Sequence, residues 1–427
     1  MRRTHAFFWG MVLAVGSMAP ATAAEGLDTG WRDRADELRG TVREILTFPG
    51  ERVPLEAQTH RTIEGDGYHI ECVTYQSEPG SRVTAHLYLP ASSDTPLPGM
   101  VVACGHGGSK SGIYYQYAGQ LYSKLGFACL IPDTIGEEER HKEGKMGTRA
   151  HDMYEFGNDS PARRAFTREK LRRMVLGKVA WDLVRGLDYL ATRSDVDSER
   201  LGIIGNSMGG TTSSFVTVVD TRVRAAVISG WSMTAQGAIQ GKDCSKMPYE
   251  AIAHAMSFNE FNALVAPHAA TLHINGDCDS IIDTAEEGKA VVRRTRAAAA
   301  GAKQILADAD IKGVIETHFV RGGGHRPYII TSRPAKWLQQ HLQRPEERRP
   351  IPPATVKLGD WVDQHGLKLE KLYDTEQRQR GTNAIDIGAV YREPAELACF
   401  PGQSAPEPQY TWEGWKSHMV NQGDIAP

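Results

Sequence analysis

The sequence predicts an α/β fold with a mostly parallel central sheet and helices on both faces. Short apolar runs of strand length alternate with longer segments of helical periodicity across most of the 427 residues. Such alternation is typical of parallel strands joined by helices that cover both faces of one sheet. Polar residues that follow these strands should therefore gather at one edge, outside the carboxyl ends of the strands.

The predicted elements begin with a hairpin, whose strands 68–75 and 82–89 flank a turn at 78–81. Further strands are expected at 100–104, 127–132, 201–205, 225–230, 271–275 and 316–320. Helices are expected at 114–125, 168–193, 211–218, 284–298 and 332–342. In the longest of these helices, apolar residues recur at helical spacing, so one face should pack on the sheet: Leu176, Val179, Ala180, Leu183, Leu187 and Leu190.

The most specific motif is Gly-x-Ser-x-Gly, which runs from Gly205 to Gly209 between a predicted strand and a predicted helix. In this strand–turn–helix context the motif predicts a nucleophile elbow with Ser207 at its tip. The tight turn crowds the backbone, so the positions on either side of it require glycine. The amide of Met208, which opens the helix, is a predicted donor to a developing oxyanion.

Three further segments follow strands in the order that this chemistry requires. The strand at 100–104 runs into a His-Gly-Gly turn, where the amide of Gly107 or Gly108 is the expected second oxyanion donor. Aspartates follow the strand at 271–275, and a glycine-rich turn ending in His325 follows the strand at 316–320. The order serine, aspartate, histidine predicts a hydrolytic triad.

On these motifs, and on 83–90 and 133–137, the chain resembles the α/β-hydrolase superfamily from about residue 68 to 342. Within it, the chain is similar to bacterial dienelactone-hydrolase-like and acetyl-xylan-esterase-like enzymes. The resemblance implies a serine carboxylic-ester hydrolase that needs no cofactor and acts on a small acyl ester of a carbohydrate or other polymer. The motif around Ser207 lacks the Cys-Ser-Arg signature of glucuronoyl esterases and the glutamine that follows the nucleophile in the cephalosporin-deacetylase type.

The acid of the triad is chosen among Asp277, Asp279 and Asp283, which all follow the strand at 271–275. The family spacing Gly-x-x-Asp selects Asp279. Asp277 is expected to brace the turn by accepting backbone N–H groups, and Asp283 to open the next helix. Among the histidines, His273 and His318 fall inside strands, so His325 is the predicted base.

Composition and the N-terminus indicate the compartment. A net charge of −3 with 41% hydrophobic residues provides no basic excess for nucleic-acid binding. Two arginines, an apolar run at 6–18 and small residues at 19–24 predict a signal peptide at 1–24. The alternative, a retained membrane anchor, is disfavoured because the apolar run is short. We therefore expect a periplasmic or secreted bacterial protein that has no membrane contact after cleavage near Ala24 or Glu25.

The domain plan consists of a catalytic domain at 25–345 and a C-terminal extension at 346–427. The extension begins at a proline-rich break and is rich in aromatic residues, so it is expected to wrap the catalytic domain rather than to be disordered. A charged loop at 137–167 is expected to overhang the site. Arg140, His141 and Trp231 are predicted to lie near the substrate. The alternative for Arg140 and His141 is a solvated run of charges, and the alternative for Trp231 is an aromatic side chain packed in the core.

Six cysteines occur in the chain. Cys72, Cys104 and Cys129 lie in apolar strands and are interpreted as buried thiols, whereas Cys244 and Cys278 are a candidate disulfide pair. The histidines are scattered and no Cys-x-x-Cys occurs, so no metal site is predicted.

Two other functions fit parts of this pattern. One is a serine peptidase of the prolyl-oligopeptidase type, disfavoured by the roughly forty residues between the expected cleavage site and the first strand. The other is a catalytically silent binding protein, disfavoured by the intact serine, aspartate and histidine.

Overall fold

The computed structural model describes residues 23–148, 168–231, 249–279, 281–282, 290–368, 380–402 and 406–422. The expected signal peptide up to residue 22, most of the 137–167 loop, Cys244 and Asp283 lie outside the described residues. Within the described part, no helix has both the length and the apolar character needed to span a membrane.

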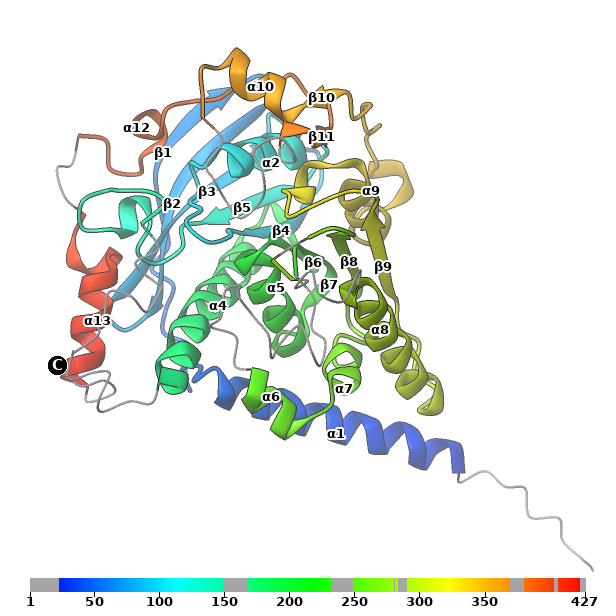
Figure 1. Ribbon diagram of the computed structural model, residues 1–427. Coiled ribbons are helices and arrows are strands. Elements are labelled where there is room, and N and C mark those ends of the chain that lie inside the picture. The colour runs from blue at the N-terminus through cyan, green and yellow to red at the C-terminus, as the bar shows by residue number, and fades with distance from the viewer. Residues whose placement is uncertain are drawn as a thin grey trace, which may run out of the picture.

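The described residues form a nine-stranded sheet in the order β1-β2-β3-β5-β4-β6-β7-β8-β9 (Figure 1). The six strands from β5 to β9 run parallel, whereas β1, β2 and β3 pair antiparallel. The predicted mostly parallel sheet is thus confirmed. The strands are β1 (Gln58–Gly65), β2 (Tyr68–Glu78), β3 (Ser81–Pro90), β4 (Leu97–Ala103), β5 (Ala128–Pro132), β6 (Val196–Asn206), β7 (Val223–Ser229), β8 (Ala270–Gly276) and β9 (Ile315–Val320).

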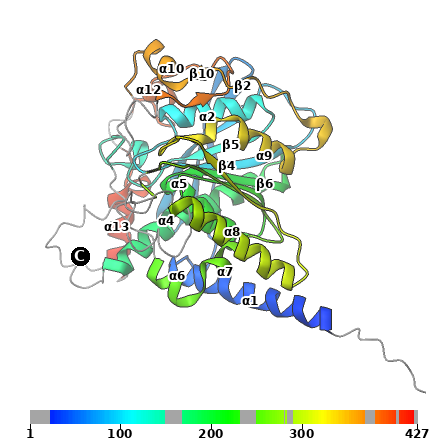
Figure 2. The ribbon, with the colours of Figure 1, turned by 45° about the vertical axis from the view of Figure 1, so that its right-hand side comes forward.

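Helices cover both faces of the sheet. On one face lie α2 (Ile113–Lys124) and α9 (Ser332–Leu342), and on the other α4 (Arg168–Thr192), α5 (Met208–Val219) and α8 (Ala290–Asp308) (Figure 2). An apolar core lies between the sheet and the helices on each face. Strand β4 contributes to both cores, because Val101 is buried in one and Val102 in the other. A strand buried on both faces has a continuous apolar sequence, which is how this one was recognised.

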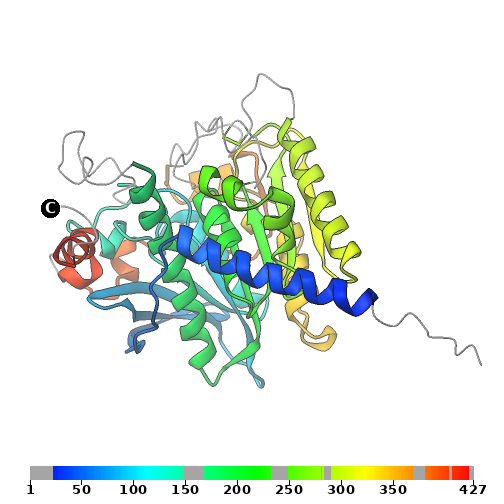
Figure 3. The same ribbon diagram turned by 90° about the horizontal axis from the view of Figure 1, so that it is seen from below.

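Several elements were not predicted, two of them in the N-terminal part of the chain. Helix α1 (Ala23–Ile45) packs across α5 and the short helix α6 (Tyr249–Ala255) (Figure 3). Its buried residues Ala35, Leu38, Val42 and Ile45 recur at helical spacing, so the signal was present in the sequence. Edge strand β1 carries no such signal, because only Ile63 of its eight residues is buried.

Helix α8 extends to Asp308, ten residues past the predicted end. Gly301 lies in its interior, where a Cβ atom would come within 2.3 Å of the side chain of Asn259. The glycine therefore permits close packing against α7 (Phe258–Ala263) instead of ending the helix.

The C-terminal extension packs along the catalytic domain (Figures 1 and 2). Gln120 of α2 accepts a hydrogen bond from the amide of Val390 and donates one to its carbonyl oxygen, and Gln116 forms the same reciprocal pair with Arg392. The extension contains β10 (Val356–Lys357), α10 (Leu358–Gln364), β11 (Asn383–Ala384), α12 (Pro394–Leu397) and α13 (Trp412–Asn421). Four short 3-10 helices complete the described elements: η1 (Glu138–Arg140), η4 (Tyr328–Ile330), η5 (Pro345–Glu347) and η6 (Pro408–Tyr410).

Candidate active site

Ser207 lies at a sharp turn between β6 and α5, with φ of 60° and ψ of −124°. A non-glycine residue rarely adopts such a backbone conformation, which marks the position as strained. A Cβ atom at Gly205 would lie 2.1 Å from the carbonyl oxygen of Gly209, and one at Gly209 would lie 2.1 Å from that of Ala103. Both glycines of the motif are therefore required by close backbone contacts, as the sequence predicts.

His325 and Asp279 are brought together by the turns that follow β9 and β8. Nδ1 of His325 lies 2.8 Å from Oδ2 of Asp279, and both side chains are buried. The other carboxylate oxygen of Asp279 accepts the amide N–H of Ile281 at 3.0 Å. The carboxylate thus has a fixed orientation and can hold one imidazole tautomer.

The competing residues have other surroundings. Oδ1 of Asp277 accepts the amide N–H of Gly322 at 2.7 Å, which braces the turn as predicted. His273 is buried within β8, and this burial lowers its pKa to about 4. His318 lies in β9, where burial and then the charge of Arg333 lower its pKa.

Ser207 and His325 line the same pocket, which is partly open to solvent. A Cβ atom at Gly230 would come within 3.0 Å of both the His325 ring and the Ser207 amide nitrogen, so the two residues converge there. The other lining residues are Gly105, His106, Tyr114, Tyr115, Asn206, Arg326, Pro327 and Ile329. A serine hydroxyl at the pocket and an imidazole held by a buried carboxylate are the parts needed for nucleophilic catalysis.

The two predicted oxyanion positions can now be separated. Met208 is the first residue of α5, and the amide at this position has no acceptor within its own helix. On the opposite turn, the amide of Gly108 donates to the carbonyl oxygen of Gly105 at 3.0 Å. The Gly108 donor is thus engaged, which favours Gly107, with a φ of 70°, of the two predicted positions. Neither glycine is among the residues that line the pocket, so the second oxyanion donor stays a prediction.

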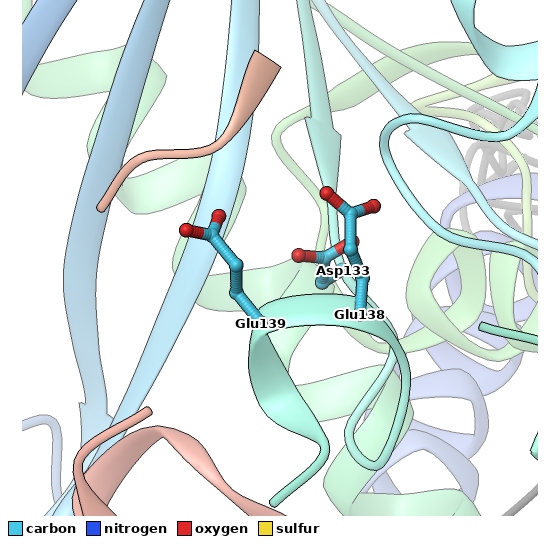
Figure 4. A group of neighbouring side chains, drawn as sticks. All are labelled: Asp133, Glu138 and Glu139. Carbon is cyan, nitrogen blue, oxygen red and sulfur yellow. The ribbon is translucent and has the colours of Figure 1, made fainter. Parts of the chain in front are cut away.

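The loop that carries Gly107 is anchored by a buried ionic cluster, which we call the Lys110 cluster. The ammonium of Lys110 lies 2.6 Å from Asp133, 2.6 Å from Glu138 and 2.8 Å from Glu139. Figure 4 shows these three carboxylates converging from the end of β5 and from η1. Such a group of carboxylates can hold a cation, and here the Lys110 ammonium contacts all three.

Burial and charge act against one another in the Lys110 cluster. Burial raises the pKa of Asp133 to about 7, aided by Glu138 and opposed by Lys110. For Glu139, burial is outweighed by Lys110 and by two amide donors, which lower its pKa to about 2. The carboxylates also outweigh burial at Lys110 and hold the pKa of its ammonium well above the ordinary value.

Two of the predicted substrate contacts are corrected by the structure. Arg140 is fully buried, and its guanidinium donates to the Asp182 carboxylate at 2.8 Å and to the carbonyl oxygens of Asp133 and Tyr410. His141 is also buried, and its Nδ1 accepts the amide N–H of Glu143. Neither lines the pocket, because their segment turns into the protein at η1 instead of forming a solvated charge run.

Trp231 is packed in the core, which was the alternative to its predicted position near the substrate. Its side chain is buried in the core beside α5, and its backbone pairs with the side chain of Asn275 through two hydrogen bonds. Trp231 directly follows Gly230, so it supports the wall of the pocket without lining it.

Several features of the site were not predicted. Tyr115 accepts the amide N–H of Gly105 at 2.5 Å, and Arg326 lines the pocket beside His325. The Lys110 cluster joins residues that are 23 to 29 positions apart. Arg326 directly follows the predicted base, so its place beside His325 could have been inferred from the sequence, whereas no sequence pattern marks the Lys110 cluster.

The cysteines agree in part with their interpretation. Cys72, Cys104 and Cys129 are buried thiols, as predicted, and Cys399 is a fourth. Cys278 is exposed, and because Cys244 lies outside the described residues, their pairing stays a prediction.

The fold and the arrangement at the pocket define a hydrolase of the α/β class. Residues 41–255, half of the chain, match the model of the acetyl xylan esterase (AXE1) family. The chain therefore belongs to this family of esterases.

Individual relatives are more distant. YtaP of Bacillus subtilis (strain 168), named as a hydrolase, is 27% identical over 200 residues, which cover 45% of this chain and 63% of that protein. Among solved structures, the methylesterase BT1017 shares 18% identity and a TM-score of 0.58 over 88% of this chain and 70% of its own. A glucuronoyl esterase from Solibacter usitatus shares 16% identity and a TM-score of 0.50 over 75% of this chain and 94% of its own. At these identities, the solved structures are similar to this chain in fold.

Proposed function

We propose that the protein is an exported serine esterase that removes a small acyl group from a carbohydrate by way of an acyl-enzyme. The observation that carries this proposal is the Asp279–His325 hydrogen bond of 2.8 Å beside a pocket that Ser207 shares with His325. Membership of an acetyl xylan esterase family supports a carbohydrate ester as the substrate.

In the first half-reaction, the Ser207 hydroxyl attacks the ester carbonyl while Nε2 of His325 accepts its proton. Asp279 stabilises the resulting imidazolium through Nδ1. The tetrahedral oxyanion is held by the amides of Met208 and Gly107. Collapse of this intermediate breaks the ester C–O bond, and His325 returns its proton to the departing sugar hydroxyl.

In the second half-reaction, a water molecule takes the place of the alcohol. His325 removes a proton from the water, the hydroxide attacks the acyl carbon, and the same two amides hold the second oxyanion. The intermediate then releases the carboxylic acid, and the imidazolium returns its proton to Ser207. Both steps use the same acid–base group, so one histidine in one orientation is sufficient.

Arg326 is our candidate for a contact that orients the substrate. It lines the pocket, is partly exposed and has no ion pair among the described residues. A guanidinium at this position can donate hydrogen bonds to the acyl carbonyl or to sugar oxygens.

A panel of substrates tests the proposed reaction. Acetylated sugars, aryl esters of increasing chain length, lactones and peptide anilides are compared by kcat/KM with the purified full chain. We expect acetyl esters to be cleaved fastest and peptide anilides not to be cleaved. Cleavage of peptide anilides with inert esters would favour the peptidase alternative, and a fully inactive but folded protein would favour the silent binding protein.

Export is tested separately. The protein recovered from the producing cell should begin near Ala24 or Glu25, as determined by mass spectrometry of its N-terminal peptide. A chain that retains Met1 in the membrane fraction would contradict the signal-peptide interpretation.

A further inference from the structure

A segment of the C-terminal extension, residues 394–400, lies against β2 and β3 and forms hydrogen bonds there. The carbonyl oxygen of Leu397 lies 2.7 Å from Nε2 of His86 and accepts a hydrogen bond from the Cys72 thiol at 3.4 Å. The amides of Cys399 and Phe400 donate to the Glu139 carboxylate at 3.0 Å and 2.9 Å. The 394–400 segment therefore contacts both the sheet and the Lys110 cluster.

Two thiols that are distant in the sequence meet beneath this segment. Cys72 lies on β2 and is paired in register with His86 of β3. The Cys399 sulfur lies 3.8 Å from the carbonyl oxygen of Val73 and 3.9 Å from that of Ala85. Cys72 in turn contacts Leu397, two positions before Cys399, so each sulfur lies against the backbone beside the other cysteine. Both side chains are buried.

The two thiols have different proton affinities. The hydrogen bond with Cys399 lowers the pKa of Cys72 to about 5, with burial opposing this effect and His86 supporting it. Burial raises the pKa of Cys399 well above the ordinary value. Burial also raises the pKa of Cys104 and of Cys129. Cys72 is thus the thiol of this group that is suited to react as a thiolate.

We propose that Cys72 and Cys399 form a disulfide that fastens the 394–400 segment to β2. The oxidant is a disulfide donor, either a small molecule such as oxidised glutathione or a protein dithiol in its oxidised form. The Cys72 thiolate attacks one donor sulfur and expels the other as a thiolate. Cys399 then loses its proton, attacks the Cys72 sulfur and expels the second donor thiolate. Two protons leave the cysteines, and the donor takes up two electrons.

This pairing has a structural consequence for the catalytic domain. In the reduced protein, the 394–400 segment is held by hydrogen bonds and by the apolar packing of Leu397, without a covalent bond to β2, and Glu139 accepts two of those hydrogen bonds. A covalent bond to β2 keeps the amides of Cys399 and Phe400 at Glu139 even when the rest of the extension detaches. Cross-linking residues so far apart in the sequence also restricts the unfolded chain, which is the usual way in which a disulfide stabilises a protein.

Peptide mapping of the purified full chain tests the proposal. The protein is equilibrated with oxidised and reduced glutathione, acid-quenched, alkylated and digested with trypsin. Trypsin releases residues 62–82 and 393–416, each with a single cysteine, so a linked peptide is unambiguous. Mapping is preferred to intact mass because the exposed Cys278 reacts with glutathione by itself.

The expected product is the 62–82 peptide linked to the 393–416 peptide, together with an increase of several degrees in the thermal midpoint over the reduced protein. Cys129→Ser is the matched control, because it alters another buried thiol and should keep both effects. Cys72→Ser and Cys399→Ser should lose both. The proposal would be overturned if, in the wild-type protein, both peptides were alkylated, carried only glutathione or were linked to Cys278. This result is read from the wild type, so it does not depend on whether any variant folds.

Discussion

The two sides of the catalytic pocket are built in different ways. On the elbow side, Ser207 and Met208 are fixed by neighbours in the chain, since the glycines at 205 and 209 allow the turn to pack closely on itself and on β4. On the opposite side, Gly107 belongs to a loop held by the Lys110 cluster and, beyond it, by the C-terminal extension. One half of the site is thus encoded locally, whereas the other depends on buried charges contributed by distant segments.

The largest expected effect concerns the local half. Asp279→Asn should leave the fold intact but reduce kcat by about four decades, because an amide favours the wrong imidazole tautomer. Asp277→Asn is the matched control, since Asp277 braces the same turn by accepting the amide N–H of Gly322, whereas Asp279 pairs with His325. Steady-state kinetics on an aryl acetate distinguish them. If kcat collapsed in the Asp277 variant alone, the acid of the triad would be Asp277 and not Asp279.

Removal of the Lys110 ammonium tests the side of the pocket that depends on distant segments. Lys110→Met leaves two buried carboxylates and one partly buried carboxylate without their ammonium, which should cost about 3–5 kcal/mol of stability. If the loop then loses its position, the second oxyanion donor is lost as well and kcat falls by about two to three decades. Lys124→Met removes a partly exposed pair with Asp66 and should cost less than about 1 kcal/mol. Urea unfolding and kinetics measure both effects, and an unchanged kcat in a folded Lys110 variant would show that the cluster does not position the loop.

Arg140 tests the correction of its predicted role. Arg140→Met removes a buried partner of Asp182, which keeps Lys178 at 2.7 Å, so we expect a loss of about 3 kcal/mol. Because Arg140 does not reach the pocket, KM should remain within about twofold of the wild-type value for all substrates. A raised KM with unchanged stability would contradict this correction and support the predicted contact between Arg140 and the substrate.

The smallest predicted effect is a pH dependence of the Lys110 cluster. The pKa of Asp133 is raised to about 7 in the folded protein, against about 3.9 in an unfolded chain. Because the folded state holds this proton to a higher pH, the contribution of Asp133 to stability falls as the pH rises from about 4 to about 7.

Between pH 5 and pH 8, the wild type should therefore lose about 2 kcal/mol relative to Asp133→Asn, which cannot ionise. Urea unfolding at both pH values measures this difference. Parallel pH profiles of the two proteins would contradict it.

The contrast between the two halves also explains what the sequence predicts and what it does not. The strands and helices around the elbow, the bracing role of Asp277, the burial of His273 and the position of His318 inside a strand follow from local pattern and were predicted. Helix α1 carried an apolar stripe and was overlooked, while β1 has an exposed polar sequence that gives no strand signal.

The failures at Arg140 and His141 have one physical cause. A charged segment was interpreted as solvated, but its acidic residues surround Lys110 and its arginine pairs with Asp182, so the charges are buried by mutual neutralisation. Pairing between distant segments is a property of the folded chain and leaves no periodicity in the sequence. The same holds for Cys72 and Cys399, whose proximity depends on the path of the extension.

The central claim is that Ser207 is the nucleophile at the end of β6, and active-site labelling tests it most directly. A fluorophosphonate probe reacts with a serine that has an activated hydroxyl, and peptide mapping then identifies the labelled residue. We predict that the wild type is labelled at Ser207, and that Ser207→Ala stays folded, is not labelled and loses about three or more decades of kcat. Labelling at another serine, or near-normal turnover in the alanine variant, would contradict this account.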